Sequence, residues 1–390
     1  MPALRLLNTE SQDKADYLHN QLTTDINVPS TYWECAESYL KGVGIYDVFL
    51  IEEQDFRNYK IFLHETGSFT KKQVFERTGF LRNLQKALIR NEYKELLDEI
   101  ERCNTVQERL KGNVRNFLIR QGIHHVREID YRTRELYESE LRRTKTFSKS
   151  LEYLKTLDRI KQFDIRKEME TLSGRNKEQL KYEGQVIFLP YIPDQDIGSD
   201  FDYIQDKSEL VWDFSQKASE NLKRQIFQIL CYALRNIKDS KDRRVRYLLP
   251  LRWMYEFCIE EGIDDIERLE LEQIKKLETI VARKVVNVKN SMQIVDNSRK
   301  ILFMSGKEIH WYANVWYMER FNFAPERVNP SNPVQRLSFY EVTNERNREL
   351  LQEYMKYQVG ISDLALGNIR SQLCYIKKFL VYFNTIESIC

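Results

Sequence analysis

One stretch of this chain recurs along the sequence, and the recurrence limits what the chain can fold into. The stretch "FLIRQGIHHVREIDYRTRELYESEL" begins at Phe117, and similar stretches begin at Tyr39 and Phe257. A shorter fourth copy, "FLVYFNTIESI", begins at Phe379 and breaks off at the end of the sequence. The three longer copies share an apolar start, then a Gly-Ile pair, then two apolar residues spaced three apart. The Gly-Ile pairs are Gly44-Ile45, Gly122-Ile123 and Gly262-Ile263. Self-similarity of this kind indicates a repeated supersecondary unit.

The repeated stretch predicts a helix, a glycine stop, a tight corner and a second helix. A glycine directly after an apolar helix supplies the left-handed C-cap, so we expect Gly122 and Gly262 to have positive φ. The helix after the corner has apolar positions at 271, 274, 277 and 281 in the third copy, which is helical spacing. Further helical segments precede the copies, for example around 220–237. We therefore expect a unit of four helices, built as two hairpins.

These features predict an all-α protein made of tandem four-helix units. The sequence has only 13 glycines and 8 prolines in 390 residues, and helix-favouring residues are abundant. Two segments of a different texture, 184–200 and 308–339, read as extended connectors with at most short strands. Aromatic residues of the second segment, among them Trp311, Trp316 and Phe321, could stack on bases, although packing between neighbouring elements explains them better.

Two neighbouring histidines form part of an H-x-x-R sequence, which occurs in several nucleic-acid-processing active sites. Here His124 and Arg127 fall in the corner of the second copy, where the other copies have Asp264-Asp265 and Tyr46-Asp47. We therefore interpret His124 and His125 as variable, solvated corner residues with no catalytic or metal-binding role.

The composition argues against a disulfide-rich, secreted or membrane-spanning protein, and it does not indicate whether the partner is nucleic acid. Net charge is +2, from 61 basic and 59 acidic residues, so bulk charge does not indicate a nucleic-acid partner. Six cysteines include no C-x-x-C pair, and we expect no disulfide framework and no metal site. The N-terminus lacks an apolar signal segment, and no run of 18 apolar residues exists, so we expect a cytoplasmic protein with no membrane partner.

The copies resemble the SAM-like core-binding domain of tyrosine recombinases, the phage-integrase superfamily. The resemblance rests on "TVQERLKGNVRNFL" (105–118), "RVRYLLPLRWMYEFCIEEGIDDIERL" (244–269) and "NIRSQLCYIKKFLVYFNTIESI" (368–389), and covers about two thirds of the chain. It implies an all-α array of SAM-like four-helix units, similar to the N-terminal regions of transposon-encoded members of that superfamily.

The copies, the segments between them and the resemblance together predict a division of the chain into six segments. They are an N-terminal helical unit (1–66), a core-binding-type unit (67–170), an extended connector (171–210), a second SAM-like unit (211–304), an aromatic, proline-rich connector (305–338) and the truncated start of a last unit (339–390).

On this resemblance the chain is the DNA-binding N-terminal region of a site-specific recombinase of a mobile element, acting in DNA integration or recombination. The family's catalytic Arg, Lys, H-x-x-R box and nucleophilic Tyr would follow the core-binding unit, and we find no catalytic residue in this chain. The expected partners are double-stranded DNA and other recombinase protomers on the same DNA, with no cofactor and no small-molecule substrate.

In the family, the starts of the second and fourth helices approach the major groove, so the predicted DNA-binding residues lie at second-helix starts. Arginine there can pair with guanine or phosphate, and a helix N-terminus itself favours phosphate. The predicted residues are Ser240, Lys241, Arg243, Arg244 and Arg246; Ser362, Asn368, Arg370 and Gln372; and Thr105, Gln107, Arg109 and Lys111.

Two other classes of function remain as alternatives. The helical units could stack into a protein-interaction scaffold without nucleic acid, which near-neutral charge favours and unequal repeat spacing disfavours. An enzyme is the weakest alternative, because the sequence has no P-loop, no G-x-G-x-x-G, no nucleophile elbow and no H-E-x-x-H.

Overall fold

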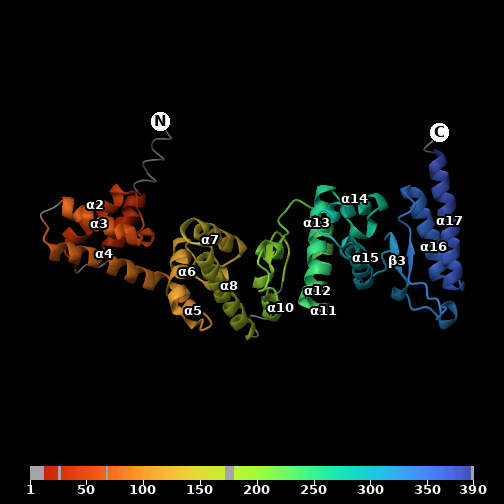
Figure 1. The fold of residues 1–390 in the computed structure, drawn as a ribbon, viewed down its shortest axis with the longest axis horizontal. Coiled ribbons are helices and arrows are strands. Elements are labelled where there is room, and N and C mark those ends of the chain that lie inside the picture. Colours follow the sequence, from red (N-terminus) through yellow and green to blue (C-terminus); the bar gives the residue numbers. More distant parts are fainter. Residues whose placement is uncertain (1–12, 25–27, 67–68, 172–179, 388–390) are drawn as a thin grey trace. The chain divides into compact units, whose positions relative to one another are not determined.

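The computed structural model describes residues 13–24, 28–66, 69–171 and 180–387 (Figure 1). These residues form α-helices and two small two-stranded antiparallel sheets, which confirms the predicted all-α class. The chain divides into two compact units. Unit 1 contains residues up to 179 together with 190–195, and unit 2 contains 180–189 together with the chain from 196 onward. None of the described helices is both long and apolar enough to cross a membrane.

Unit 1 contains two four-helix groups. The first consists of helical residues 13–22, α2 (Ser30–Gly42), α3 (Glu53–Thr66) and α4 (Lys71–Glu92). The second consists of α5 (Lys94–Arg102), α6 (Glu108–Arg120), α7 (Tyr131–Thr144) and α8 (Phe147–Met169).

The boundary predicted between residues 66 and 67 lies one helix too early. Val74, Leu81 and Leu84 of α4 are buried in the hydrophobic cluster of the first group, so α4 is the fourth helix of that group. A single residue, Tyr93, separates α4 from α5. No glycine or proline marks this junction, which is why the sequence pattern assigned α4 to the following unit.

Unit 2 contains a third four-helix group, preceded by strands β1 (Val186–Phe188) and β2 (Val211–Asp213). Its helices are α11 (Glu220–Asn236), a continuous helix over 240–260, α14 (Leu271–Ala282) and α15 (Val288–Ser305). The continuous helix comprises α12 (Ser240–Asp242), the π-helical turn η5 (Arg243–Leu248) and α13 (Leu249–Glu260). Pro250 follows the π turn. Since proline has no N–H and its ring crowds the carbonyl four residues earlier, a wider turn at this point relieves the clash.

The same plan begins again after α15. Strands β3 (Val315–Tyr317) and β4 (Arg336–Ser338) pair, and then α16 (Glu345–Gly360) and α17 (Leu366–Glu387) follow as a first and a second helix. The two sheets match in detail: the N–H of Phe214 donates to the carbonyl of Gln185, and the N–H of Phe339 donates to the carbonyl of Asn314. The sheets consist of short strands, as predicted for the connectors. Strands β1, β3 and β4 lie in the predicted connectors 171–210 and 305–338, and β2 lies just after the first of them.

The aromatic connector is packed into protein. Trp316 is fully buried in the cluster that β3, β4, α16 and α17 share, and Trp311 meets it edge-on with ring centroids 4.9 Å apart. Phe321 packs against the same cluster. Base stacking by these rings is therefore disfavoured.

The glycine stops have the predicted backbone conformation. Gly44, Gly122 and Gly262 have φ values of 76°, 67° and 65°. Each is followed by a corner that contains one short 3-10 turn, namely η1 (Val48–Leu50), η2 (Val126–Glu128) or η6 (Ile266–Arg268). The repeat predicted from sequence is therefore a repeat in structure.

Candidate functional site

The first corner is held by two polar side chains that bond to each other and to the backbone. Gln21, from the first helix, donates through Nε2 to Asp47 Oδ1 at 2.9 Å, and its Oε1 accepts from the N–H of Val48 at 2.9 Å. Asp47 Oδ1 also accepts from the N–H of Phe49 at 3.0 Å. The pair therefore satisfies backbone donors that the turn would otherwise leave without an acceptor.

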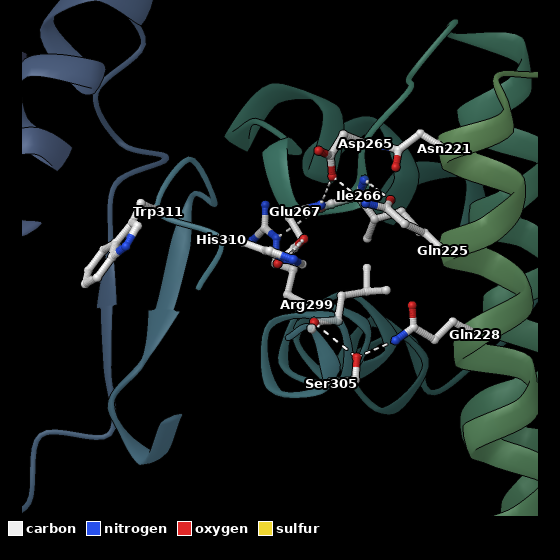
Figure 2. A network of polar contacts seen from close by, with 12 residues as sticks. Asn221, Gln225, Gln228, Asp265, Ile266, Glu267, Arg299, Ser305, His310 and Trp311 are labelled. Carbon is white, nitrogen blue, oxygen red and sulfur yellow. Dashed lines mark hydrogen bonds and ion pairs between the residues drawn. The ribbon is translucent and has the colours of Figure 1, made fainter. Parts of the chain in front are cut away.

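The third corner repeats this arrangement atom for atom (Figure 2). Gln225 of α11 donates to Asp265 Oδ1 at 2.8 Å and accepts from the N–H of Ile266 at 2.8 Å, while Asp265 Oδ1 accepts from the N–H of Glu267 at 2.9 Å. We call this pair, a side chain of the first helix and a side chain of the corner, the corner clamp.

The second corner has a related clamp with different chemistry, in which the corner side chain makes no bond to the backbone of its 3-10 turn. Glu99 of α5 accepts from the N–H of Val126 at 2.7 Å, and its other oxygen lies 3.3 Å from Nδ1 of His125. Glu99 thus replaces the glutamine and His125 replaces the aspartate. The interpretation of His125 as a solvated corner residue is wrong, because its side chain is largely buried between Glu99 and Glu95. His124 stacks on Tyr93, with ring centroids 4.6 Å apart.

The fourth helix of each group holds the opposite side of its corner. One long polar side chain donates to two corner carbonyls in every group. The three are Gln85 on the carbonyls of Val48 and Ile51, Lys161 on those of Val126 and Arg127, and Arg299 on those of Ile266 and Leu269.

At the third corner an ionisable pair includes a carboxyl group that is almost fully buried. The side chain of Glu267 is 1% exposed, and its Oε2 lies 2.7 Å from Nδ1 of His310, while its Oε1 has no hydrogen-bond partner among the described residues. Burial, assisted by the nearby Asp265 carboxylate, raises the pKa of Glu267 to about 8. Burial lowers the pKa of His310. At neutral pH the protonated carboxyl can donate to the neutral imidazole, so the Oε2–Nδ1 contact is a hydrogen bond that needs no buried charge.

A second contact joins the segment before β3 to this corner. The backbone N–H of Asn314 donates to the carbonyl of Glu267 at 2.9 Å, and its side-chain Nδ2 donates to the carbonyls of Arg268 and Leu269 at 2.8 and 3.1 Å. The third corner is therefore a polar junction between the third four-helix group and the sheet that follows it.

The predicted DNA-binding cluster at 240–246 is largely engaged with protein groups. Arg243 is 3% exposed; its Nε donates to the carbonyl of Ile237 at 2.8 Å and its Nη1 lies 3.0 Å from Asp200. Arg244 binds Glu209 through two nitrogens, at 2.8 and 2.6 Å.

The rest of that cluster lies at the surface. Lys241 is exposed, and Arg246 is half exposed with Asp242 3.4 Å away. Ser240 is partly buried. Of the three arginines, only Arg246 combines exposure with a weak, solvent-screened ion pair.

The predicted DNA-binding residues of the second group also include one buried residue and several exposed ones. Lys111 is 6% exposed, and its Nζ donates to the carbonyl of Glu101 at the end of α5. Thr105, Gln107 and Arg109 are exposed at the start of α6. Lys111 and Arg243 thus have one shared role, which is to hold the carbonyl end of a first helix.

The last group of predicted DNA-binding residues lies in the turn before α17 (Ser362) and in the first turns of that helix (Asn368, Arg370 and Gln372). Asn368 and Arg370 are exposed. Ser362 donates to the carbonyl of Gln358 at 2.7 Å, and Gln372 accepts from the hydroxyl of Tyr354 at 3.4 Å.

The structure adds a surface that the sequence interpretation did not identify. Arg109 Nη2 lies 3.4 Å from Glu152 Oε1 of α8, so the starts of α6 and α8 lie side by side. Exposed at the start of α8 are Phe147, at 77%, Lys149 and Lys155. We call this surface, made of Thr105, Gln107, Arg109, Phe147, Lys149 and Lys155, the α6–α8 face.

A signal for the fourth-helix starts was present in the sequence. Each fourth helix follows a polar N-cap residue and has lysine in its first turn. The N-caps and lysines are Thr70 with Lys71 and Lys72, Thr146 with Lys149, and Asn287 with Lys289.

Known proteins give no guide to this site. Compared with protein-family models, with curated proteins and with solved structures, the chain has no match. Among the described residues, no group of three or more His, Cys, Asp or Glu side chains is placed to hold a metal ion.

Proposed function

We propose that this chain is the DNA-binding, non-catalytic N-terminal region of a site-specific tyrosine recombinase of a mobile element, working in the cytoplasm on DNA integration or recombination. The observation that supports it most is the α6–α8 face, where exposed cations at a second-helix start and a fourth-helix start lie together. In the family that the sequence resembles, these two helix starts approach the major groove. Duplex DNA, and other recombinase protomers on it, are the proposed partners.

The chemistry of the α6–α8 face suits a duplex. Arg109, Lys149 and Lys155 provide charges for phosphates, and Thr105 and Gln107 provide neutral hydrogen-bonding groups. Glu152 weakens the local potential, so the proposed affinity is moderate. The overall charge of the chain is nearly balanced, so these cations are a local feature of one surface.

The proposed contact set is smaller than the one predicted from sequence. Lys111 and Arg243 are buried and bonded to backbone carbonyls, and Arg244 is bound to Glu209, so we leave these three out. The remaining residues with exposed or partly exposed side chains stay in the proposal. They are Thr105, Gln107, Arg109, Ser240, Lys241, Arg246, Ser362, Asn368, Arg370 and Gln372.

A salt titration with random-sequence duplex tests this proposal. Each phosphate contact adds about 0.9 to the slope of log affinity against log salt, so Arg109→Ala with Lys149→Ala should weaken binding and lower the slope by roughly 1.8. The matched control removes two exposed cations of α4, Lys86→Ala with Arg90→Ala, and should leave the slope unchanged. Equal effects of the two double variants would reject the α6–α8 face as the contact.

The second candidate function is a protein-interaction scaffold. Exposed Phe75 and Phe147, both 77% exposed, favour it, because large apolar side chains at a surface often mark protein contacts. Absence of any salt-dependent DNA binding by the unmodified chain would favour the scaffold over the recombinase region.

A further inference from the structure

A hollow of about 520 Å³ lies between α17 and the connector that carries β4. Its polar lining consists of three cations and three neutral residues that can form hydrogen bonds, namely Arg336, Arg370 and Lys377 with Ser331, Asn332 and Gln335. Among the described residues that line it there is no aspartate or glutamate. We call this cationic space the β4–α17 hollow.

In the third group, a carboxylate occupies the corresponding place. Arg370 is the fifth residue of α17, and Arg244 is the fifth residue of the continuous helix over 240–260. Arg244 binds Glu209, which stands two residues before β2. Two residues before β4 the chain has Val334 instead. Arg370 therefore lacks the carboxylate that its counterpart has, and its guanidinium has no hydrogen-bond or ion-pair partner among the described residues.

The other two cations of the hollow are already paired. Arg336 binds Asp296 of α15, and Nζ of Lys377 lies 3.0 Å from Oε1 of Glu341. Three cations against two carboxylates leave one positive charge without compensation. That charge belongs to Arg370, which is exposed on the wall that α17 contributes.

A complete group leaves this surface open to solvent. In the third group Ser208 is exposed, and the side chains of Arg244 and Glu209 are 29% and 27% exposed. The helices α14 and α15 therefore do not cover the place that corresponds to the hollow. The difference between the two groups lies in the connector, where Val334 stands in the position of Glu209.

We propose that the β4–α17 hollow binds the phosphate group of a phosphate ester. Arginine binds carboxylate and phosphate through two parallel N–H···O bonds, and Arg244 already binds a carboxylate in this way. Cations and neutral donors that approach from both α17 and the connector suit a tetrahedral group with several oxygens. The volume also lies within the roughly 300–1,000 Å³ of small-molecule sites, so the ester group has room beside the phosphate.

Two sources can supply such a phosphate, a small ester such as a free nucleotide or the backbone of duplex DNA. The small ester would be a ligand beyond the proposed function. The DNA backbone would make the hollow a contact of the proposed DNA-binding region, and in that case the inference rests on the proposed function.

A nuclear magnetic resonance titration of the full chain with inorganic phosphate, at constant ionic strength, tests the proposal. We expect saturable shifts of the amide signals around the hollow. Arg370→Ala should raise the Kd by roughly tenfold or more, because charge-assisted hydrogen bonds are lost. Gln335→Glu, which adds a negative charge to the lining at nearly unchanged size, should also weaken binding.

Arg346→Ala is the matched control, because it removes an exposed cation of α16 that does not line the hollow. At constant ionic strength it should change the Kd by less than about twofold. The proposal is overturned if the unmodified chain shows no saturable phosphate binding, or if Arg370→Ala binds phosphate equally well. An equal loss in Arg346→Ala also overturns it, since that result means general attraction of anions to the surface.

A short random-sequence duplex identifies the source of the phosphate. If DNA supplies it, Arg370→Ala and Gln335→Glu should weaken duplex binding more than Arg346→Ala does. If a small ester supplies it, both variants should lose phosphate binding and keep the duplex affinity of the unmodified chain. A chain that binds phosphate but no duplex rejects the proposed DNA-binding role and retains the hollow as a site, whereas a chain that binds duplex but no phosphate rejects the hollow alone.

Discussion

Glu267 has a carboxyl group that is almost fully buried, and burial makes its proton part of the folded state. The unfolded chain would release this proton near the ordinary glutamate pKa of 4.5, whereas the folded chain keeps it until the pKa of about 8. The folded state therefore binds more protons between these two values. The stabilising effect of this proton is complete below 4.5 and is lost as the pH rises through about 8.

Glu267→Gln should remove this dependence, because the amide keeps a donor for His310 and never ionises. We expect the variant to be more stable than the wild type above neutral pH, by on the order of 2–4 kcal/mol near pH 9, and to differ little near pH 4. Urea unfolding at several pH values measures it. Glu308→Gln, at an exposed position of the same segment, is the control and should keep the wild-type slope. An identical slope in wild type and Glu267→Gln would show that the buried carboxyl does not govern it.

The burial and contacts of single side chains were harder to predict from sequence than the helices. Arg243 and Lys111 looked like surface cations because they stand at helix starts among polar neighbours. In the structure they bind the carbonyl ends of the preceding helices. The sequence shows which residues are charged. Whether a charged side chain is buried depends on which other segments pack over it, and those segments can be distant in the sequence.

At the scale of elements, the corner clamp explains why the Gly-Ile pattern recurs with variable polar residues. The glycine turns the chain, the clamp satisfies the N–H groups of the turn, and the fourth helix satisfies its carbonyls. Gln with Asp accepts from two N–H groups of the turn, whereas Glu with His accepts from one, that of Val126. The sequence therefore tolerates exchange of the pair while the geometry of the corner is retained.

Gln225→Ala should destabilise unit 2 by about 1–3 kcal/mol, because it leaves the buried N–H of Ile266 without an acceptor and removes a donor from Asp265. Gln228→Ala, on the same helix and bonded only to Ser305 at the surface, is the matched control and should cost less than ~0.5 kcal/mol. Thermal or urea unfolding measures both. Equal losses in the two variants would show that the clamp adds nothing beyond an ordinary surface hydrogen bond.

Helices and corners were predictable because their signals are local. The glycine stops, the break before 240 and the apolar spacing of α14 all follow from neighbouring residues. The division into groups failed at α4, where one residue separates two helices and no turn-forming residue marks the change of group. Packing of Val74, Leu81 and Leu84 decides that assignment, and no local pattern encodes it.

At the scale of the whole molecule, the two compact units share a crossing segment. Residues 180–189 belong to unit 2 and include β1, residues 190–195 belong to unit 1, and unit 2 resumes at 196. Within unit 1, the hydroxyl of Tyr191 donates to Asp158 at 2.7 Å, and Arg134 binds the same carboxylate at 2.8 Å. This buried triad attaches the crossing segment to α7 and α8.

Tyr191→Phe should destabilise unit 1 by about 1–3 kcal/mol and leave unit 2 unchanged, because a carboxylate loses one of its donors. Hydrogen exchange followed by mass spectrometry resolves the two units: amides of α7 and α8 should exchange faster, and those of α11 and α15 at the wild-type rate. Tyr203→Phe, which removes a long 3.5 Å contact to Ser240 at the surface, is the control. Faster exchange in α11 as well would mean that the two units unfold together.

The crossing segment has a further consequence for how such a protein can be rearranged. Two modules joined end to end can be exchanged by one cut in the gene between them. Here a cut after 179 would leave the Tyr191 attachment on the wrong side, and a cut after 195 would separate β1 from its partner strand β2. Transfer of either unit into another protein must therefore include all of residues 180–195. Otherwise the new protein must replace both the Tyr191 contact and the pairing of β1 with β2.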